Sequence, residues 1–514
     1  MLVEAQESFW VATSLSTSYP ALDRDLEVDV AVVGGGIVGI TTALLLAQDG
    51  RKVALVEADR VINGVTGHTT AKVTSLHTLI YAELAERLDQ DAARLYGEAN
   101  EAGLDTIRRL CREHEIECEL RDTSAYTFAT SDDEVERLER EVETAVSVGL
   151  PASFVDEPPL PFPTSGAVRF SGQAQLHPRK YLLPLVTQLE SAGGQVFERS
   201  RVVDIERGTP SRVHTDAGHV VTAESVVVAT HAPILDAKLL VARSRASRGY
   251  ALALEAGDAL PDGMFISAST PSHSVRTATF EGRAVLVVSG EGHSVGEPGA
   301  GGARTHSEQL ERWARDALGA GDVLFRWSTQ DLYSLDRRPF IGAIDKRSRI
   351  FTASGFGGWG MTTGTAAGML LRDLVLERES PWSELFDPGR LEPKALPALV
   401  SKGAHDAKRL IGDRLGRDEP PEAAAELERG EGKIVRVDGE RLAVSRDAAG
   451  ALHSVSAVCT HLGCIVSWND AEESWDCPCH GSRFAATGEV LQGPATTALA
   501  DKSELLAAVP TPSA

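Results

Sequence analysis

The chain has 514 residues, which is too long for one hydrophobic core and predicts roughly three folding units. Its 42% hydrophobic and 24% charged residues are typical of a soluble globular protein. The formal net charge of −23 argues against a nucleic-acid partner, because phosphate binding requires clustered Lys and Arg side chains. No apolar run reaches about 18 residues, and the first residues lack the basic start and apolar stretch of a signal peptide. We therefore predict no transmembrane segment and a cytoplasmic location.

The first strong pattern, between residues 28 and 57, is that of a βαβ unit. Apolar runs over 28–33 and 52–56 predict buried parallel strands, and the apolar segment 37–48 predicts a helix. Gly34, Gly36 and Gly39 open the helix, and Glu57 ends the second strand. In this context the glycines let a pyrophosphate approach the helix N-terminus, and the acid accepts hydrogen bonds from ribose hydroxyls. The alternative is a glycine-rich turn that binds no ligand. The pattern of three glycines and an acid does not by itself distinguish an FAD site from an NAD site.

Residues 66–330 mix helical and strand-like segments. The polar segment 66–77 predicts a loop that leads into a helix, 81–115 has a helical period, and 120–170 alternates short strands with Pro-rich turns. A helix is predicted over 177–194, followed by strands over 196–206, 212–215 and 220–230. Residues 245–330 contain further strands and a glycine-rich loop at 296–302. We interpret that loop as a surface loop, because it does not follow a strand.

The last third of the chain changes character. A buried strand over 350–353 leads into the glycine-rich segment 355–360 and a helix from Thr362 to about Leu376. Prolines then interrupt residues 381–421, which we interpret as an interdomain connector with one short helix over 404–415. The runs 433–437 and 441–445 flank Asp438-Gly439, which predicts a β-hairpin and a small all-β final unit.

Two short blocks near the C-terminus combine cysteine and histidine at metal-ligand spacing. The first contains Cys459, His461 and Cys464, and the second Cys477, Cys479 and His480. Thiolates and imidazoles from two loops of a β scaffold suit a metal centre, and by ligand type a zinc site remains the alternative to an iron–sulfur cluster. Cys111 and Cys118 lie apart from these blocks, and we expect both to be buried on or near a helix.

The two blocks resemble the signature of the Rieske [2Fe–2S] family, over roughly residues 425–510. The resemblance implies that Cys459 and Cys477 bind one iron and that His461 and His480 bind the other. Cys464 and Cys479 hold the positions of the disulfide that ties the cluster loops together in the high-potential branch of that family, although a disulfide is unusual in the cytoplasm. Two neutral imidazoles make such a cluster a better electron acceptor, at about −150 to +300 mV against about −400 mV for plant-type ferredoxins.

Residues 28–376 resemble the D-amino-acid-oxidase-like family of FAD oxidoreductases. Three segments carry the likeness: a second flavin loop at 66–72, a Pro-helix-Gly-strand segment at 177–204, and a flavin-closing segment at 336–342 with 355–362. In that family the backbone at Val203 would meet the adenine. The implied FAD-binding residues are Gly34, Gly36, Ile37, Val38, Gly39, Glu57, His68, Thr69, Thr70, Val203, Gly355, Gly358, Trp359, Gly360, Met361 and Thr362.

Together the two resemblances imply a three-part fold. We expect an α/β FAD-binding domain of the Rossmann-like, glutathione-reductase type, an α+β substrate domain and a small all-β Rieske domain. We assign residues 1–77, 171–240 and 331–380 to the FAD-binding domain and residues 78–170 and 241–330 to the substrate domain. Residues 381–421 are then the linker, and 422–514 the Rieske domain.

The resemblances also imply an enzyme, an FAD-dependent oxidoreductase that oxidises a C–N bond of an amine or amino acid. FAD takes two electrons and a [2Fe–2S] centre passes one at a time, so the fusion predicts transfer onward to an acceptor protein or quinone. The alternatives are a flavin reductase fed by the Rieske domain and a redox carrier or sensor with little turnover. No general base is evident from the sequence. His68 either makes a polar contact with the flavin or links it covalently. Trp359 either lines the substrate face of the flavin or fills the core.

Overall fold

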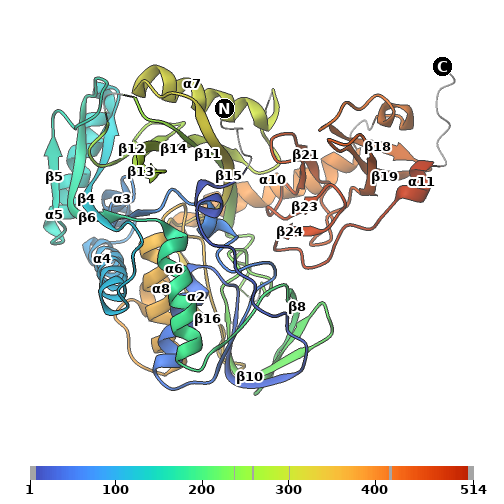
Figure 1. Cartoon of the computed structure of the whole chain (residues 1–514), viewed down its shortest axis with the longest axis horizontal. Helices are drawn as coiled ribbons and strands as arrows, with labels where there is room; N and C mark the ends of the chain where they lie inside the picture. The colour runs from blue at the N-terminus through green and yellow to red at the C-terminus, as the bar shows by residue number, and fades with distance from the viewer. Residues whose placement is uncertain (1–6, 237, 258–259, 300, 416–418, 508–514) are drawn as a thin grey trace.

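The computed structural model describes residues 7–236, 238–257, 260–299, 301–415 and 419–507. They form two large mixed sheets with their helices and a small unit of two antiparallel sheets, which lies at one end of the molecule (Figure 1). No helix within these ranges is long and apolar enough to cross a membrane.

The first large sheet has eight strands and contains the predicted βαβ unit. Its main order is β16-β17-β10-β1-β2-β7, with β9 added antiparallel to β10 and β8 to β9. All neighbours from β17 to β7 are parallel, and β16 is antiparallel to β17. The strands are β1 (Leu26–Val33), β2 (Val53–Val56), β7 (Gln195–Phe197), β8 (Val202–Glu206), β9 (Ser211–Thr215), β10 (Val220–Val228), β16 (Phe340–Asp345) and β17 (Ile350–Ser354).

Three helices pack together on one face of this sheet. They are α2 (Ile37–Gln48), α6 (Pro178–Ser191) and α8 (Gly360–Val375), visible side by side in Figure 1. Val30 and Val32 of β1 belong to the core under these helices, whereas Ala31 and Val33 belong to the core on the opposite face. Successive strand residues point to opposite faces, so an apolar run buried on both sides explains why this segment was predicted as a strand.

The second large sheet has nine strands in the order β15-β11-β14-β13-β12-β4-β6-β3, with β5 paired to β6. Helix α7 (Gly302–Leu318) packs on β11 and β14, and α5 (Val135–Ser147) packs on β5 and β6. The strands are β3 (Lys72–Val73), β4 (Arg121–Ala129), β5 (Ala152–Val155), β6 (Gly166–Gln175), β11 (Ser244–Glu255), β12 (Met264–Ser267), β13 (His273–Phe280), β14 (Arg283–Ser294) and β15 (Val323–Ser334).

The helical segment predicted over 81–115 is two helices, α3 (Ile80–Arg87) and α4 (Gln90–Glu113). Asp89 separates them, because its side chain accepts a hydrogen bond from Ala92 N (2.8 Å) and so caps the second helix. Helix α4 packs on α8 and thereby joins the two large parts. Cys111 and Cys118 are buried, as expected, with their sulfurs 3.6 Å apart.

Within residues 419–507 the small C-terminal unit is all-β apart from α11 (Ser503–Ala507) and the short 3₁₀ turn η4 (Pro421–Ala424), and its first two strands confirm the predicted hairpin. One sheet has the order β18-β19-β20 and the other β21-β22-β23-β24, all antiparallel. The strands are β18 (Gly432–Val437), β19 (Glu440–Arg446), β20 (Leu452–Ser456), β21 (Ser467–Asn469), β22 (Ser474–Asp476), β23 (Arg483–Ala485) and β24 (Val490–Gln492).

The connector contains a longer helix than the one predicted over 404–415. Helix α10 runs from Leu396 to Leu415, and Pro397 lies in its first turn, where a missing N–H group costs no helical hydrogen bond. In Figure 1 this helix extends toward the small unit. The remaining short elements are α1 (Phe9–Ala12), α9 (Ser383–Phe386), η1 (Val65–His68), η2 (Asp132–Glu134), η3 (Pro393–Ala395) and η4 (Pro421–Ala424).

The glycine-rich loop at 296–302 is partly exposed, with Gly299 and Gly301 at the surface, but it follows β14, contrary to the expectation that no strand precedes it, and it also contacts the small unit. Ser467 Oγ donates to Gly296 O (3.0 Å), and Ala303 N donates to Asp470 Oδ1 (2.7 Å). Both partners in the small unit lie far along the sequence, so no local pattern in the loop indicates this contact.

Candidate functional site

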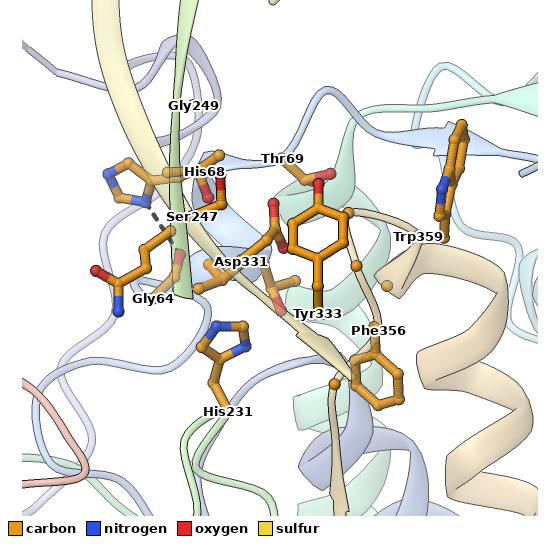
Figure 2. Close-up of a pocket in the computed structure, with 18 of the residues that line it drawn as sticks. Gly64, His68, Thr69, His231, Ser247, Gly249, Asp331, Tyr333, Phe356 and Trp359 are labelled. Atoms are coloured by element: carbon orange, nitrogen blue, oxygen red, sulfur yellow. Dashed lines mark hydrogen bonds between the residues drawn. The ribbon is translucent and has the colours of Figure 1, made fainter. Parts of the chain in front are cut away.

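A cavity of about 910 Å³ lies where the three parts meet. Its wall is built from the start of α2, the loop 62–70, β11, β15, the segment 355–361 and residues 491–496 of the small unit; Figure 2 shows part of it. Most of the predicted cofactor residues line it: Gly34, Gly36, Ile37, Val38, Glu57, His68, Thr69, Thr70, Gly355, Gly358, Trp359, Gly360 and Met361.

The turn between β1 and α2 needs glycine for space. Gly34 has a φ of 109°, and a Cβ there would lie 2.5 Å from Ala229 O. A Cβ on Gly39 would lie 1.9 Å from Gly34 O. Gly36 caps α2 without a side-chain hydrogen bond, the first residues of the helix line the cavity, and Ile37 N donates to Thr66 Oγ1 (3.2 Å), another lining residue. Such a helix start suits an anionic group.

Glu57 follows β2 and presents a carboxylate to the same part of the cavity. Its Oε2 accepts from Gly35 N (2.6 Å) and its Oε1 from Asp59 N (2.9 Å). Burial raises the pKa of Glu57, and the two N–H groups oppose that shift. The carboxylate thus fixes the glycine turn and offers acceptors to hydroxyl groups.

The loop predicted to contact flavin is fixed to the second sheet. His68 Nδ1 lies 3.0 Å from Gly64 O (Figure 2), and Trp327 Nε1 donates to His68 O (2.9 Å). Beyond the loop, Lys72 Nζ donates to Phe265 O (2.6 Å). Burial, followed by repulsion from Arg276, lowers the pKa of Lys72 to about 7. A cavity-lining amine therefore loses much of its charge near neutral pH.

The segment 355–361 enters α8 through a series of glycine turns. Gly355, Gly357 and Gly358 have φ values of 78°, 58° and 88°, which side-chain-bearing residues rarely adopt. Trp359 lines the cavity and stacks on His77, with ring centroids 4.6 Å apart and an interplanar angle of 16°. The indole is therefore held flat at the cavity wall by a second ring.

The four predicted cluster ligands converge at the tips of two loops. The thiols of Cys459 and Cys477 are hydrogen-bonded to each other, and the rings of His461 and His480 have centroids 5.0 Å apart. Nδ1 of each histidine is buried and has no hydrogen-bond partner among the described residues. Burial, then repulsion from Lys402 and His461, lowers the pKa of His480 to about 3, which leaves the ring neutral as a metal ligand requires.

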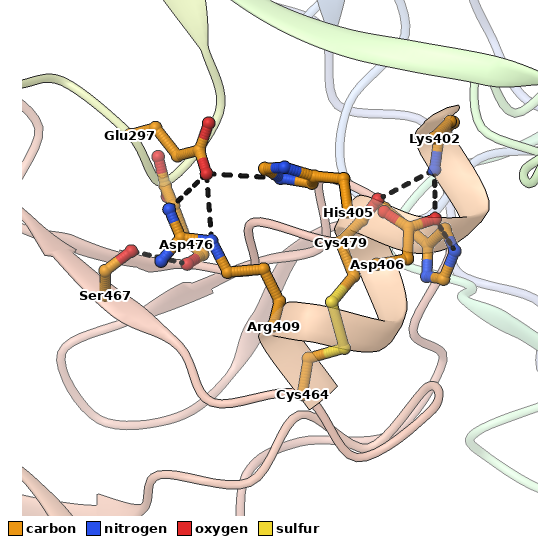
Figure 3. Close-up of a disulfide and its surroundings, with 10 residues drawn as sticks. Glu297, Lys402, His405, Asp406, Arg409, Cys464, Ser467, Asp476 and Cys479 are labelled. Carbon is orange, nitrogen blue, oxygen red and sulfur yellow. Dashed lines mark hydrogen bonds and ion pairs between the residues drawn. A yellow bond between two sulfur atoms is a disulfide. The ribbon is translucent and has the colours of Figure 1, made fainter. Parts of the chain in front are cut away.

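A disulfide joins Cys464 to Cys479, as the Rieske resemblance implies (Figure 3). The sulfur of Cys477 lies within 4.8 Å of both disulfide sulfurs. The disulfide therefore crosslinks the two loops directly beside the ligand set.

The ligand loop and the cavity are joined by two contacts. Gln330 of β15, which lines the cavity, donates from Nε2 to Gly481 O (2.7 Å), the residue after His480. Arg248 of β11 pairs with Asp476 Oδ2 at 3.1 Å, and both side chains are almost fully buried, at 1% and 3% exposed. The small unit is thus anchored at the edge of the cavity through residues adjacent to the ligands.

Comparison with known proteins decides the family. Residues 29–374 match the family described as FAD dependent oxidoreductase, and residues 421–509 match the Rieske [2Fe-2S] domain. The chain belongs to the FAD dependent oxidoreductase family. Its cofactors are FAD and a [2Fe–2S] cluster, so the zinc alternative for the C-terminal ligands is not supported.

Similar proteins agree with this family. YhfW of Bacillus subtilis (strain 168), named as a Rieske 2Fe-2S iron-sulfur protein, is 39% identical over 496 residues, which are 96% of each chain. Gamma-glutamylputrescine oxidoreductase of Escherichia coli (strain K12) is 24% identical over 389 residues, covering 73% of this chain and 90% of its own. The crystal structure of glycine oxidase from Geobacillus kaustophilus covers 71% of this chain and 99% of its own, with 21% identity and a TM-score of 0.59, which shows a shared fold.

The cavity of this FAD dependent oxidoreductase fits a dinucleotide. It offers the N-terminus of α2 for phosphates, with Thr66 Oγ1 beside Ile37 N, a carboxylate for hydroxyls and a glycine-lined wall for a flat ring system. Three predicted residues lie outside the lining. Gly39 packs against the glycine turn, Val203 follows the lining residue Val202 at a bulge of β8, and Thr362 donates from Oγ1 to Thr74 O (2.8 Å).

Several cavity residues were not found from the sequence. Asp331 and Tyr333 of β15 point into the pocket in Figure 2, and Asp331 accepts from Gly358 N. Burial raises the pKa of Asp331 to about 6. His231 lines the cavity, and its Nε2 is buried without a hydrogen-bond partner in the described part of the chain. The alternating positions 329, 331 and 333 of a strand were the one available signal, because they share a face.

Proposed function

We propose that this FAD dependent oxidoreductase oxidises a C–N bond of an amine or amino acid and sends the electrons through its Rieske domain to an external acceptor. The observation that carries the proposal is the hydrogen bond from Gln330, a lining residue of the cavity, to Gly481 of the cluster loop. When bound, FAD accepts a hydride equivalent and the cluster accepts single electrons. A route between them requires the two sites to be close, and this contact supports it.

The chain's own residues have separable tasks in this proposal. The start of α2 binds the pyrophosphate, Glu57 accepts from ribose hydroxyls, and the backbone at Val203 meets the adenine. The segment 355–362 and the loop 68–70 hold the flavin ring. Cys459 and Cys477 bind one iron, and His461 and His480 bind the other through Nδ1.

A nitrogen-containing substrate is supported by two observations. Two of the similar proteins are named for nitrogen compounds, gamma-glutamylputrescine and glycine. In addition, the Asp331 carboxyl lies in the cavity beside Gly358, where it suits an ammonium group. We therefore infer that Asp331 orients the amine end of the substrate.

The test is an anaerobic titration of the purified holoprotein with candidate amines and amino acids. Flavin absorbance and the EPR signal of the reduced Rieske centre are followed together. We expect a substrate that bleaches the flavin also to produce the EPR signal. Bleaching without cluster reduction would contradict the electron route.

Gln330→Leu tests the contact that carries the proposal. We expect substrate to bleach the flavin at an unchanged rate, whereas cluster reduction slows about tenfold or more because the connecting hydrogen bond is lost. Gln492→Leu is a matched control, since Gln492 lines the same cavity from the Rieske domain but its Nε2 has no partner among the residues described. Equal behaviour of the two variants would count against a special role for Gln330.

A further inference from the structure

Helix α10 of the connector lies against the cluster loop through two charged side chains. Asp406 Oδ2 is 3.7 Å from His480 Nε2 and 2.5 Å from Lys402 Nζ, and Lys402 also reaches Cys479 O at 3.4 Å (Figure 3). Lys402 is 7% exposed and Asp406 is 21% exposed at the side chain. The pair is therefore largely shielded from water, where charges act more strongly on their neighbours.

A second pair of contacts holds α10 in this position. His405 Nε2 lies 3.2 Å from Glu297 Oε1, and Arg409 Nε donates to the same oxygen at 2.9 Å (Figure 3). Glu297 belongs to the loop 296–302 of the second large part. The helix is thus anchored on one side to that loop and on the other to the cluster-binding loop.

We propose that Asp406 is a positioning residue that accepts a hydrogen bond from His480 Nε2 in the cluster-loaded protein and lowers the reduction potential of the cluster. Ligation through Nδ1 leaves the proton on Nε2, which faces Asp406. A carboxylate at this nitrogen makes the imidazole a stronger donor and stabilises the oxidised, more positive cluster.

The neighbouring ammonium opposes this effect. Lys402 brings a positive charge to the same ligand loop, which favours the reduced cluster. His461 makes no ion pair within the described ranges, so the charge pair acts on one of the two histidine ligands. The potential is then set by two residues of the connector, outside the Rieske domain itself. This inference rests on the cluster and not on the amine substrate.

The test is an EPR-monitored redox titration of the full-length holoprotein and its variants, with iron and sulfide contents measured for each. We expect Asp406→Asn to raise the potential, shifting the equilibrium toward the reduced cluster by about tenfold, which is about 59 mV for one electron. Lys402→Met is expected to lower the potential, and Asp406→Glu to retain the parent value.

Glu297→Gln is the matched control, because it weakens the second anchor of α10 without changing the charges beside His480. We expect its potential to equal that of the parent protein. An unchanged or lowered potential in Asp406→Asn would overturn the proposal. So would shifts of the same sign in Asp406→Asn and Lys402→Met, since loosening of the helix and not charge would then be the cause.

Discussion

Burial shifts the protonation of several side chains around the cavity. It raises the pKa of Asp331 to about 6, lowers that of His231 to about 4, and with Arg276 lowers that of Lys72 to about 7. Near neutral pH the cavity therefore contains a carboxylate close to its protonation point, a neutral imidazole and a partly neutral amine. Asp331 is the lining carboxylate whose neighbour, Gly358, belongs to the flavin-closing segment.

Asp331→Asn is expected to raise KM for an amine substrate about tenfold or more, because a charge-assisted hydrogen bond is lost. In the parent protein kcat/KM should rise with pH up to a plateau above about pH 6, since the carboxyl must be ionised to bind an ammonium group. In Asp331→Asn this rise of kcat/KM with pH should be absent. Steady-state kinetics from pH 5 to 8 provide the measurement, and an unchanged profile would contradict a role for Asp331.

The raised pKa of Asp331 also makes the free energy of unfolding depend on pH. Its folded pKa lies above the unfolded value of about 3.9, so the folded protein holds a proton that the unfolded chain has released between about pH 4 and 6. Its contribution to stability therefore falls as the pH rises through that window.

At the scale of elements, sequence patterns predicted the features that depend on residues close together in the chain. The strands and helix of the βαβ unit follow from apolar runs and glycines that lie within residues 28–57, and the cluster ligands follow from two short blocks. Helix α10 was predicted too short, because Pro397 was interpreted as a break although it lies in the first turn. Gln330 and Asp331 could not be found, because their partners come from other segments of the chain.

Gly39→Ala is expected to disturb the packing of α2 against the glycine turn. The added methyl group would lie 1.9 Å from Gly34 O, and such overpacking costs about 2 kcal/mol. We expect a lower melting temperature and reduced FAD content, measured by thermal unfolding and by absorbance.

Gly403→Ala in α10 is the control for this change. Apart from its chain neighbours and the backbone of its own helix, no described atom comes within 4 Å of a Cβ at Gly403, so the substitution should gain about 1 kcal/mol of helix propensity and leave FAD content unchanged. Normal FAD content in Gly39→Ala would show that the turn tolerates the methyl group.

At the scale of the whole molecule, the Rieske domain is held against the cavity by a buried ion pair. Burial acts to raise the pKa of Asp476, but Arg248 and Arg483 outweigh it and hold the pKa below its ordinary value. Asn469 and Ser474 donate to the same carboxylate at 3.0 and 2.9 Å. Such a fully partnered charge tolerates burial, whereas loss of one partner is costly.

Arg248→Met is therefore expected to destabilise the protein by about 3–5 kcal/mol and to loosen the Rieske domain. Limited proteolysis of the connector should become faster, and substrate should reduce the cluster more slowly than it bleaches the flavin. Arg94→Met removes an exposed pair with Asp91 and Glu98 and should leave the stability nearly unchanged, because solvent screens that pair. Equal stability of the two variants would contradict the importance of the buried pair.

The cavity wall formed by residues 491–496 has a consequence for biogenesis. These residues leave the ribosome after the whole of the FAD-binding part, so that wall is missing while the earlier segments fold. The dinucleotide can enter from that open side before the final domain closes over it. The wall is completed when the Rieske domain docks, because the loop that carries His480 then contacts Gln330 at the edge of the cavity.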